Sequence, residues 1–214
     1  MNRVQIKICG ITTVADARGA AAAGADFLGF VLFPGSPRCV TPTRIRRIVE
    51  ALRRPVLKVG VFVNAAPAEI EAAMATAGLD LAQLHGTEPE SVARRIGAER
   101  VWKGLALNQE ADVAAAAHYP AAAVVVDAIR PGAWGGTGEL SNWDMAAALA
   151  RRCRVVLAGG LTPTNVGRAI ADVQPFAVDV SSGVESRPGC KDHERVRAFV
   201  AAVRASADSR NDAN

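Results

Sequence analysis

Residues 121–127 read AAAVVVD, a continuous apolar run that ends abruptly in a carboxylate. Strands of a parallel sheet are covered on both faces and have this near-continuous apolar character. The segment 123–126 is one of eight short β-forming runs that recur at steady intervals along the chain. The other seven are Val4–Ile8, Phe27–Leu32, Val56–Val63, Leu79–Leu84, Val101–Leu105, Val155–Leu157 and Phe176–Val180.

Stretches rich in alanine, arginine and glutamate separate these runs. Strands that alternate with helical stretches indicate parallel βαβ units. The spacing leaves about 27 residues per unit, just enough for a strand, a helix and two loops. Eight such even units favour a single-domain (β/α)8 TIM barrel over an open doubly wound sheet. We expect this barrel domain over residues 1–205 and a flexible polar tail at 206–214.

Local patterns predict two helix starts and one helix face. Thr13 and Asp16 have the spacing of a capping box. Thr162 followed by Pro163 predicts an N-cap and a first helical residue. In the basic stretch 44–54, apolar residues recur with helical spacing, so the arginines should lie on a solvated face. Nucleic acid is not an expected partner, because no aromatic residues are interleaved with these arginines.

The composition is that of a soluble α/β protein with an aliphatic core: 50% of the residues are hydrophobic, 5% are aromatic and the net charge is +4. No apolar run reaches the roughly 18 residues of a membrane span, and no signal-peptide pattern is present, so we expect a cytoplasmic protein. The four cysteines lack zinc-site spacing and are not expected to form disulfides. A monomer is favoured, since no exposed apolar stripe stands out.

The first run places a charge and a thiol at the predicted barrel mouth, where the active sites of such barrels lie. Lys7 and Cys9 alternate onto the face that points into the barrel. A lysine this close would favour the thiolate of Cys9. Cys9 is therefore either a reactive thiol or, like most isolated cysteines, a small buried hydrophobe.

Asp127 ends its apolar run roughly across the mouth from Cys9. The loop that follows, 128–138, is long and glycine-rich, which is typical of loops that close over a ligand. Asp127 is therefore a candidate catalytic acid. The alternative is an ordinary loop or helix-capping aspartate.

Glycine and serine follow the last two runs. In barrels of this type the loops after the seventh and eighth strands commonly hold phosphate on backbone N–H groups. Glycine lets the backbone approach the anion closely. The pattern favours a phosphate site over two ordinary turns, and its candidate residues are Gly159, Gly160, Ser181, Ser182 and Gly183.

Two further segments supply polar candidates. Arg38 lies in a loop stiffened by three prolines, and a rigid arginine is suited to bind a carboxylate through two hydrogen bonds. The alternative is an ordinary surface arginine. Gln83 and His85 share one face of their strand and are expected to line the pocket.

Together these segments resemble the phosphoribosylanthranilate isomerase family of tryptophan biosynthesis. The resemblance covers roughly residues 4–200, in the family's order. It rests on KICGIT (7–12), GFV (29–31), SPR (36–38), VGVFVN (59–64), QLHG (83–86), GGTG (135–138), GGL (159–161) and DVSSGVE (179–185). The chain departs from the family at ELSNW (139–143), where an aromatic residue and an aspartate usually precede the tryptophan.

The resemblance implies a (β/α)8 barrel without metal or organic cofactor. It also implies a reaction, the Amadori rearrangement of N-(5-phosphoribosyl)anthranilate to 1-(2-carboxyphenylamino)-1-deoxyribulose 5-phosphate. In the family's pattern Cys9 matches the general base, Asp127 the general acid and Arg38 the residue that binds the anthranilate carboxylate. Asp179 matches a carboxylate near the sugar hydroxyls, and the glycine-rich segments match the phosphate site.

Lys7, Gln83 and His85 are expected to complete the substrate pocket. Three other functions stay open. The histidine-pathway isomerase performs the same rearrangement, but it has an aspartate at the position of Cys9 and a second phosphate site. A phosphosugar-binding protein would bind phosphate without turnover. A nucleophilic enzyme using Cys9 and His85 would form a covalent adduct on Cys9.

Overall fold

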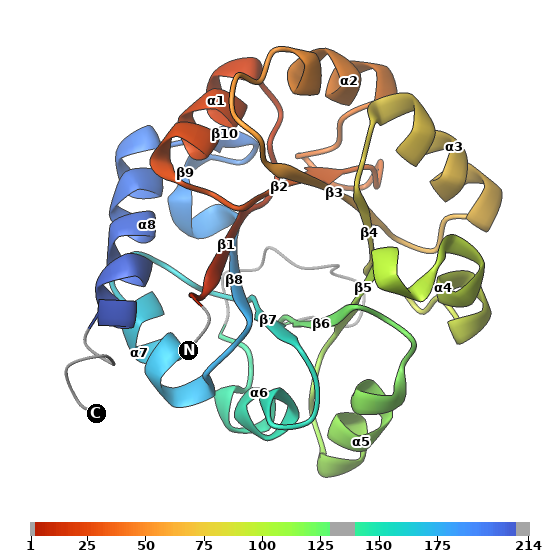
Figure 1. The fold of residues 1–214 in the computed structure, drawn as a ribbon, viewed down its shortest axis with the longest axis vertical. Coiled ribbons are helices and arrows are strands. Elements are labelled where there is room, and N and C mark those ends of the chain that lie inside the picture. The colour runs from red at the N-terminus through yellow and green to blue at the C-terminus, as the bar shows by residue number, and fades with distance from the viewer. Residues whose placement is uncertain (1–2, 129–139, 209–214) are drawn as a thin grey trace.

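The structure, a computed structural model, describes residues 3–128 and 140–208. Eight parallel strands close into a barrel in chain order, with β8 hydrogen-bonded to β1 (Figure 1). The predicted barrel is confirmed and the open sheet is excluded. The strands are β1 (Gln5–Ile8), β2 (Phe27–Val31), β3 (Leu57–Phe62), β4 (Leu81–Leu84), β5 (Val101–Leu105), β6 (Ala123–Val126), β7 (Val155–Leu157) and β8 (Ala177–Val180).

The helices form a ring around the barrel (Figure 1). They are α1 (Val14–Ala23), α2 (Pro42–Glu50), α3 (Pro67–Ala77), α4 (Glu90–Ile96), α5 (Glu110–His118), α6 (Trp143–Ala150), α7 (Val166–Val173) and α8 (His193–Asp208), with short 3-10 turns η1 (Ala98–Arg100) and η2 (Ser182–Val184). A small antiparallel hairpin of β9 (Glu185–Arg187) and β10 (Cys190–Lys191) follows β8. This hairpin lies outside the eight strands predicted from the sequence.

The chain ends differ slightly from the expected domain limit. Helix α8 continues to Asp208, beyond the predicted domain end at 205. The rest of the predicted tail, 209–214, lies outside the described residues, as does 129–138 of the glycine-rich loop.

Half of the predicted capping box is present at the start of α1. The Thr13 hydroxyl accepts a hydrogen bond from the Asp16 N–H at 3.1 Å. The Asp16 carboxylate lies 3.0 Å from His193 Nε2 on α8 instead of closing the box. Asp16 therefore joins the first helix to the last.

The predicted start of α7 at Pro163 is wrong, because the helix begins at Val166. Residues 163–165 form a turn. The Thr162 N–H donates to the Asn165 side-chain oxygen at 2.8 Å, and the Asn165 amide donates to the Gly160 carbonyl at 2.9 Å. These two hydrogen bonds hold a compact loop after β7.

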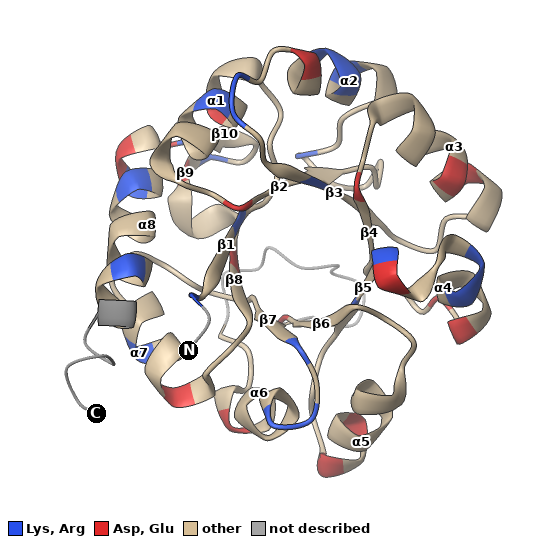
Figure 2. Ribbon diagram, in the orientation of Figure 1, with Lys and Arg blue, Asp and Glu red and all other residues tan. Residues whose placement is uncertain are grey.

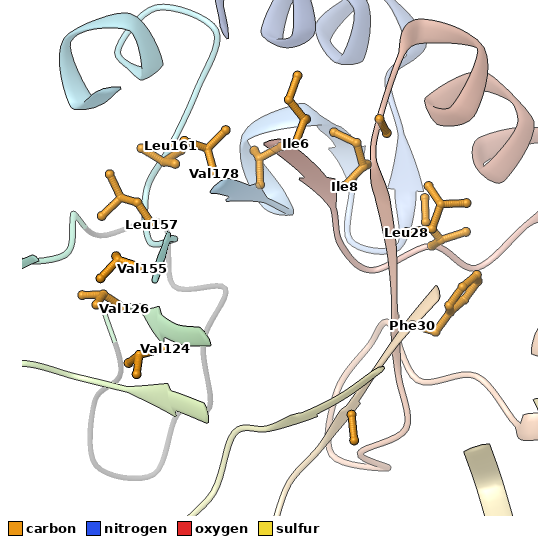
Figure 3. Close-up of a cluster of buried hydrophobic side chains, with 14 of the residues drawn as sticks. Ile6, Ile8, Leu28, Phe30, Val124, Val126, Val155, Leu157, Leu161 and Val178 are labelled. Carbon is orange, nitrogen blue, oxygen red and sulfur yellow. The ribbon is translucent and has the colours of Figure 1, made fainter. Parts of the chain in front are cut away.

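Apolar side chains fill two layers, one on each side of the barrel wall. Ile6 and Ile8 point outward from β1 to the helices, together with residues of the neighbouring strands (Figure 3). Inside the barrel, the rings of Phe27 and Trp102 pack edge to face with centroids 4.8 Å apart. Lys7 lies between the two outward isoleucines in sequence and faces inward, as the alternation predicts.

Charged residues of both signs are scattered along the helices of the outer ring (Figure 2). On α2, Ile45 and Ile48 are buried while Arg44, Arg46 and Arg47 are exposed, so the predicted solvated basic face is confirmed. Among the helices of residues 3–128 and 140–208, none has the length and apolar character needed to cross a membrane.

Leu157→Ala should destabilise the fold by about 2–5 kcal/mol, because it empties a fully buried site between β7 and the helices. Leu57→Ala is the matched control, since Leu57 is 46% exposed; it should change stability by only about 0.5 kcal/mol. Urea denaturation measures both changes. Equal losses in the two variants would contradict this description of the core.

Candidate active site

A cavity of about 780 Å³, counting its open mouth, lies at the carboxyl ends of the strands. Active sites of (β/α)8 barrels occupy this position. Apart from Lys7, the cavity wall contains every candidate site residue predicted from the sequence: Cys9, Arg38, Gln83, His85, Asp127, Gly159, Gly160, Asp179, Ser181, Ser182 and Gly183.

Lys7 lies beneath the cavity and forms a buried ion pair. Its ammonium is 2.6 Å from Asp179 Oδ2, and its side chain is 0% exposed. The two residues are register partners on β1 and β8, which meet where the barrel closes. Burial lowers the pKa of Lys7, but the charge of Asp179 and the contact with Cys9 outweigh burial and raise it. Lys7 is therefore a cation whose direct partner is Asp179.

Cys9 follows β1 and is buried, with its sulfur packed over Gly29 of β2. A Cβ at Gly29 would lie only 2.6 Å from Cys9 Sγ, so this glycine makes room for the thiol. Burial raises the pKa of Cys9, although Lys7 acts in the opposite direction. Lys7 favours the thiolate, as expected, but desolvation outweighs this effect and the pKa of Cys9 is raised overall.

Gln83, His85 and Asp127 form a polar row across the cavity. Gln83 Nε2 lies 2.9 Å from His85 Nδ1, and His85 Nε2 lies 3.4 Å from Asp127 Oδ2. The other oxygen, Asp127 Oδ1, accepts from the Ala128 N–H at 2.8 Å. A side chain at Gly104 of β5 would overlap the imidazole. Because both ring nitrogens face Gln83 and Asp127, this geometry does not support a Cys9–His85 nucleophilic pair.

Backbone donors converge where β7 and β8 end. Gly159 and Gly160 have φ angles of +81° and +62°, a region that favours glycine. The N–H groups of Gly160, Ser182 and Gly183 donate to no atom of the described chain. A Cβ at Gly183 would overlap the Leu161 carbonyl. Free N–H groups on glycine backbone suit an anion such as phosphate.

Arg38 is held by residues that the sequence analysis did not single out. Its guanidinium makes a two-pronged ion pair with Glu185, with Nη2–Oε2 at 2.7 Å and Nε–Oε1 at 2.9 Å. Lys191 also binds Glu185, at 2.8 Å. Arg38 is only 12% exposed in its side chain and is not an ordinary surface arginine. The Pro188-Gly189 turn was the signal that could have revealed the hairpin carrying Glu185 and Lys191.

The described residues, 3–128 and 140–208, contain no group of three or more histidine, cysteine or acidic side chains that could hold a metal ion.

Comparison with known proteins identifies the family. The sequence model of N-(5'-phosphoribosyl)anthranilate isomerase matches residues 6–202. The protein of that name from Citrifermentans bemidjiense is 48% identical over 197 residues, which is 92% of this chain and 95% of the relative. The chain belongs to the phosphoribosylanthranilate isomerase family. It is therefore an isomerase, and the resemblance found in its sequence is confirmed.

Solved structures of the family have the same fold. A phosphoribosylanthranilate isomerase from Thermus thermophilus superimposes with a TM-score of 0.87 at 42% identity, covering 94% of this chain and 99% of the other. A second family structure is a complex with reduced 1-(o-carboxyphenylamino)-1-deoxyribulose 5-phosphate. It has a TM-score of 0.83 at 39% identity, with the same coverage of 94% and 99%.

The buried position of Cys9 predicts its reactivity. At neutral pH, iodoacetamide should alkylate Cys9 more slowly than the exposed Cys39, because burial shields the Cys9 sulfur and raises its pKa. The rate of Cys9 alkylation should keep rising above about pH 8.5, which is the ordinary pKa of a thiol, because the Cys9 thiolate forms only at higher pH. Peptide mass mapping over a pH series gives both rates in one sample. Faster labelling of Cys9 than of Cys39 at pH 7 would contradict this assignment.

Proposed function

We propose that the chain catalyses the Amadori rearrangement of N-(5-phosphoribosyl)anthranilate, with Asp127 as general acid and Cys9 as general base. One observation carries the proposal. The two groups follow β6 and β1 into a single cavity, which also contains an arginine and a cluster of free backbone N–H groups. These features match a substrate with a carboxylate at one end and a phosphate at the other.

The proposed first step opens the sugar ring. Asp127 protonates the furanose ring oxygen, the C1′–O bond breaks, and the amine nitrogen forms a Schiff base with C1′. Asp127 must carry a proton to do this. The Ala128 N–H, which donates to Asp127 Oδ1 at 2.8 Å, orients the carboxyl group, and His85 Nε2 lies 3.4 Å from Oδ2. General acid catalysis of this kind contributes about 10²–10⁴-fold in rate.

The proposed second step removes the C2′ proton. Cys9 takes this proton, and the electron pair of the broken C–H bond gives an enolamine, which tautomerises to the ketone. Since burial favours the neutral thiol, the resting enzyme holds Cys9 largely protonated. The base is the minor thiolate form, which Lys7 below it favours electrostatically.

The remaining contacts orient the substrate. We assign Arg38 to the carboxylate and the N–H groups at 159–160 and 182–183 to the phosphate. Asp179 Oδ1 and Gln83 Oε1 are buried cavity atoms without a hydrogen-bond partner in the described chain, and they fit the sugar hydroxyls. Lys7 acts indirectly, by holding Asp179.

Rescue of a bacterium that lacks this isomerase tests the proposal, on medium without tryptophan. The wild-type chain should restore growth, whereas Cys9→Ala should not. Cys153→Ala is the matched control and should rescue, since Cys153 precedes β7 at the opposite end of the barrel. A phosphosugar-binding protein without catalysis would fail to rescue.

A cytoplasmic location and a monomeric state also stay predictions. Light scattering tests the monomeric state.

Asp127→Asn should retain substrate binding but lose most turnover, because an amide of the same size cannot deliver a proton. Asp172→Asn on the outer surface of α7 is the control and should remain fully active. Steady-state kinetics and binding of the reduced product analogue measure the two effects. A tenfold loss of rate corresponds to an increase of about 1.4 kcal/mol in the activation free energy. If the variant kept more than about a tenth of the wild-type rate, Asp127 would not be the general acid.

Arg38→Ala should weaken binding of the reduced product analogue by about 1.5–3 kcal/mol, the contribution of a charge-assisted pair. The loss should shrink for an analogue that lacks the carboxylate. Arg95→Ala, which removes a comparable two-pronged pair with Glu71 on the surface, should leave both affinities unchanged. Calorimetric titration measures these affinities. An equal loss with both ligands would assign Arg38 to another part of the substrate.

A further inference from the structure

The hairpin β9–β10 carries two buried charges that the proposed mechanism does not use. Glu185 and Lys191 are register partners on its two strands. Their side chains are 4% and 0% exposed, and neither lines the cavity. Buried charges are costly unless they are paired and hydrogen-bonded. Their retention at the cavity's edge therefore calls for an explanation.

Glu185 joins two cations through one carboxylate. Its oxygens accept from Arg38 Nε and Nη2, and Oε1 also accepts from Lys191 Nζ at 2.8 Å. Lys191 in turn donates to the Ser181 carbonyl at 3.1 Å, in the loop of the free N–H groups. Burial raises the pKa of Glu185, but the hydrogen bond from Arg38 and the charge of Lys191 outweigh it and lower the pKa overall. Glu185 is thus a carboxylate that connects Arg38, through Lys191, to the loop after β8.

Arg38 is fixed from its other sides as well. Its stem crosses Gly10, where a Cβ would lie 2.6 Å from Arg38 Cδ, and Gly10 has a φ of +76°. The backbone N–H of Arg38 donates to the Ser36 hydroxyl at 3.2 Å. The hairpin turn is tied down by a 2.6 Å hydrogen bond from the Thr12 hydroxyl to the Gly189 carbonyl. These contacts leave the arginine little freedom to turn.

The pairing leaves one edge of the guanidinium free. Nε and Nη2 face Glu185, whereas Nη1 makes no hydrogen bond within the described chain. Arg38 lines the cavity, so the free donors of Nη1 and Nη2 are available there. A planar pair of N–H donors matches the two oxygens of a carboxylate.

We propose that Glu185 and Lys191 are positioning residues, which hold the free guanidinium edge of Arg38 toward the cavity and so make the isomerase specific for a carboxylate-bearing aromatic amine. The inference rests on the proposed function. Without Glu185 the arginine keeps its charge but regains side-chain freedom, which binding must then remove. Affinity for the carboxylate should fall even though the site becomes more positive.

Glu185→Gln tests the proposal with two ligands. One is reduced 1-(o-carboxyphenylamino)-1-deoxyribulose 5-phosphate, and the other is its phenylamino counterpart without the carboxylate. The variant should bind the first about tenfold more weakly and the second almost unchanged. The KM for substrate should rise about tenfold while kcat stays within about threefold. Glu71→Gln, in the matched surface pair with Arg95, should change none of these values.

A double-mutant cycle separates positioning from a general structural role. In the Arg38→Ala background, Glu185→Gln should cause no further loss of carboxylate affinity, because the residue it orients is gone. A purely structural glutamate would weaken both ligands in both backgrounds. Independent losses, or equal losses for the two ligands, would overturn the proposal.

Arg38→Lys keeps the proposal testable if Glu185→Gln does not fold. Lysine retains the charge but cannot form the two-pronged pair, so it should bind the carboxylate ligand almost as weakly as Arg38→Ala. Wild-type affinity in Arg38→Lys would overturn the proposal. Wild-type turnover is measured first. If the wild-type chain showed no turnover, the proposed function itself would be rejected. If the wild type turned over normally and Glu185→Gln bound the carboxylate ligand with wild-type affinity, only the role of Glu185 would be rejected.

Discussion

The buried ion pair between Lys7 and Asp179 is the contact on which the site depends. It joins the first and last strands at the point where the barrel closes, with 2.6 Å between the charged atoms. One oxygen of Asp179 is used in the pair, and the other is buried at the cavity without a hydrogen-bond partner among the described residues. The ammonium also lies under Cys9 and acts on its protonation. A single interaction therefore orients a polar group and sets the electrostatics of the thiol.

A second set of buried charges, also made of cations paired with a carboxylate, lies at the edge of the cavity. Arg38 and Lys191 share Glu185, as Lys7 is matched by Asp179. The set has three cations and two carboxylates, so one positive charge is in excess while Cys9 is a neutral thiol. This excess positive charge favours anionic groups at Arg38, because Asp127, also in the cavity wall, is uncharged in the protonated form that the proposed mechanism requires. The charges that orient the site also select the kind of molecule that enters it.

The barrel could be predicted because each strand is a short apolar run, and the runs recur at steady intervals between helical stretches. Three strands, β5, β6 and β7, have the predicted bounds. Most site residues could be found because they follow strand ends, which a barrel brings to one mouth. The ion pairs could not be found in this way, since Lys7 and Asp179 are 172 residues apart and Arg38 and Glu185 are 147 apart. Their pairing depends on register and on the hairpin. The desolvation that raises the pKa of Cys9 could not be predicted either, because burial depends on the folded chain rather than on neighbours in sequence.

The Lys7–Asp179 pair serves the site rather than the stability of the fold. Removing one partner of a buried pair typically costs about 3–5 kcal/mol, whereas replacing both with apolar residues is often neutral. The decisive measurement compares Lys7→Met with the double variant Lys7→Met, Asp179→Leu, by urea unfolding and by turnover. We expect the single variant to be strongly destabilised, and the double variant to regain most of the wild-type stability but to remain inactive. A stable double variant with wild-type turnover would contradict this expectation.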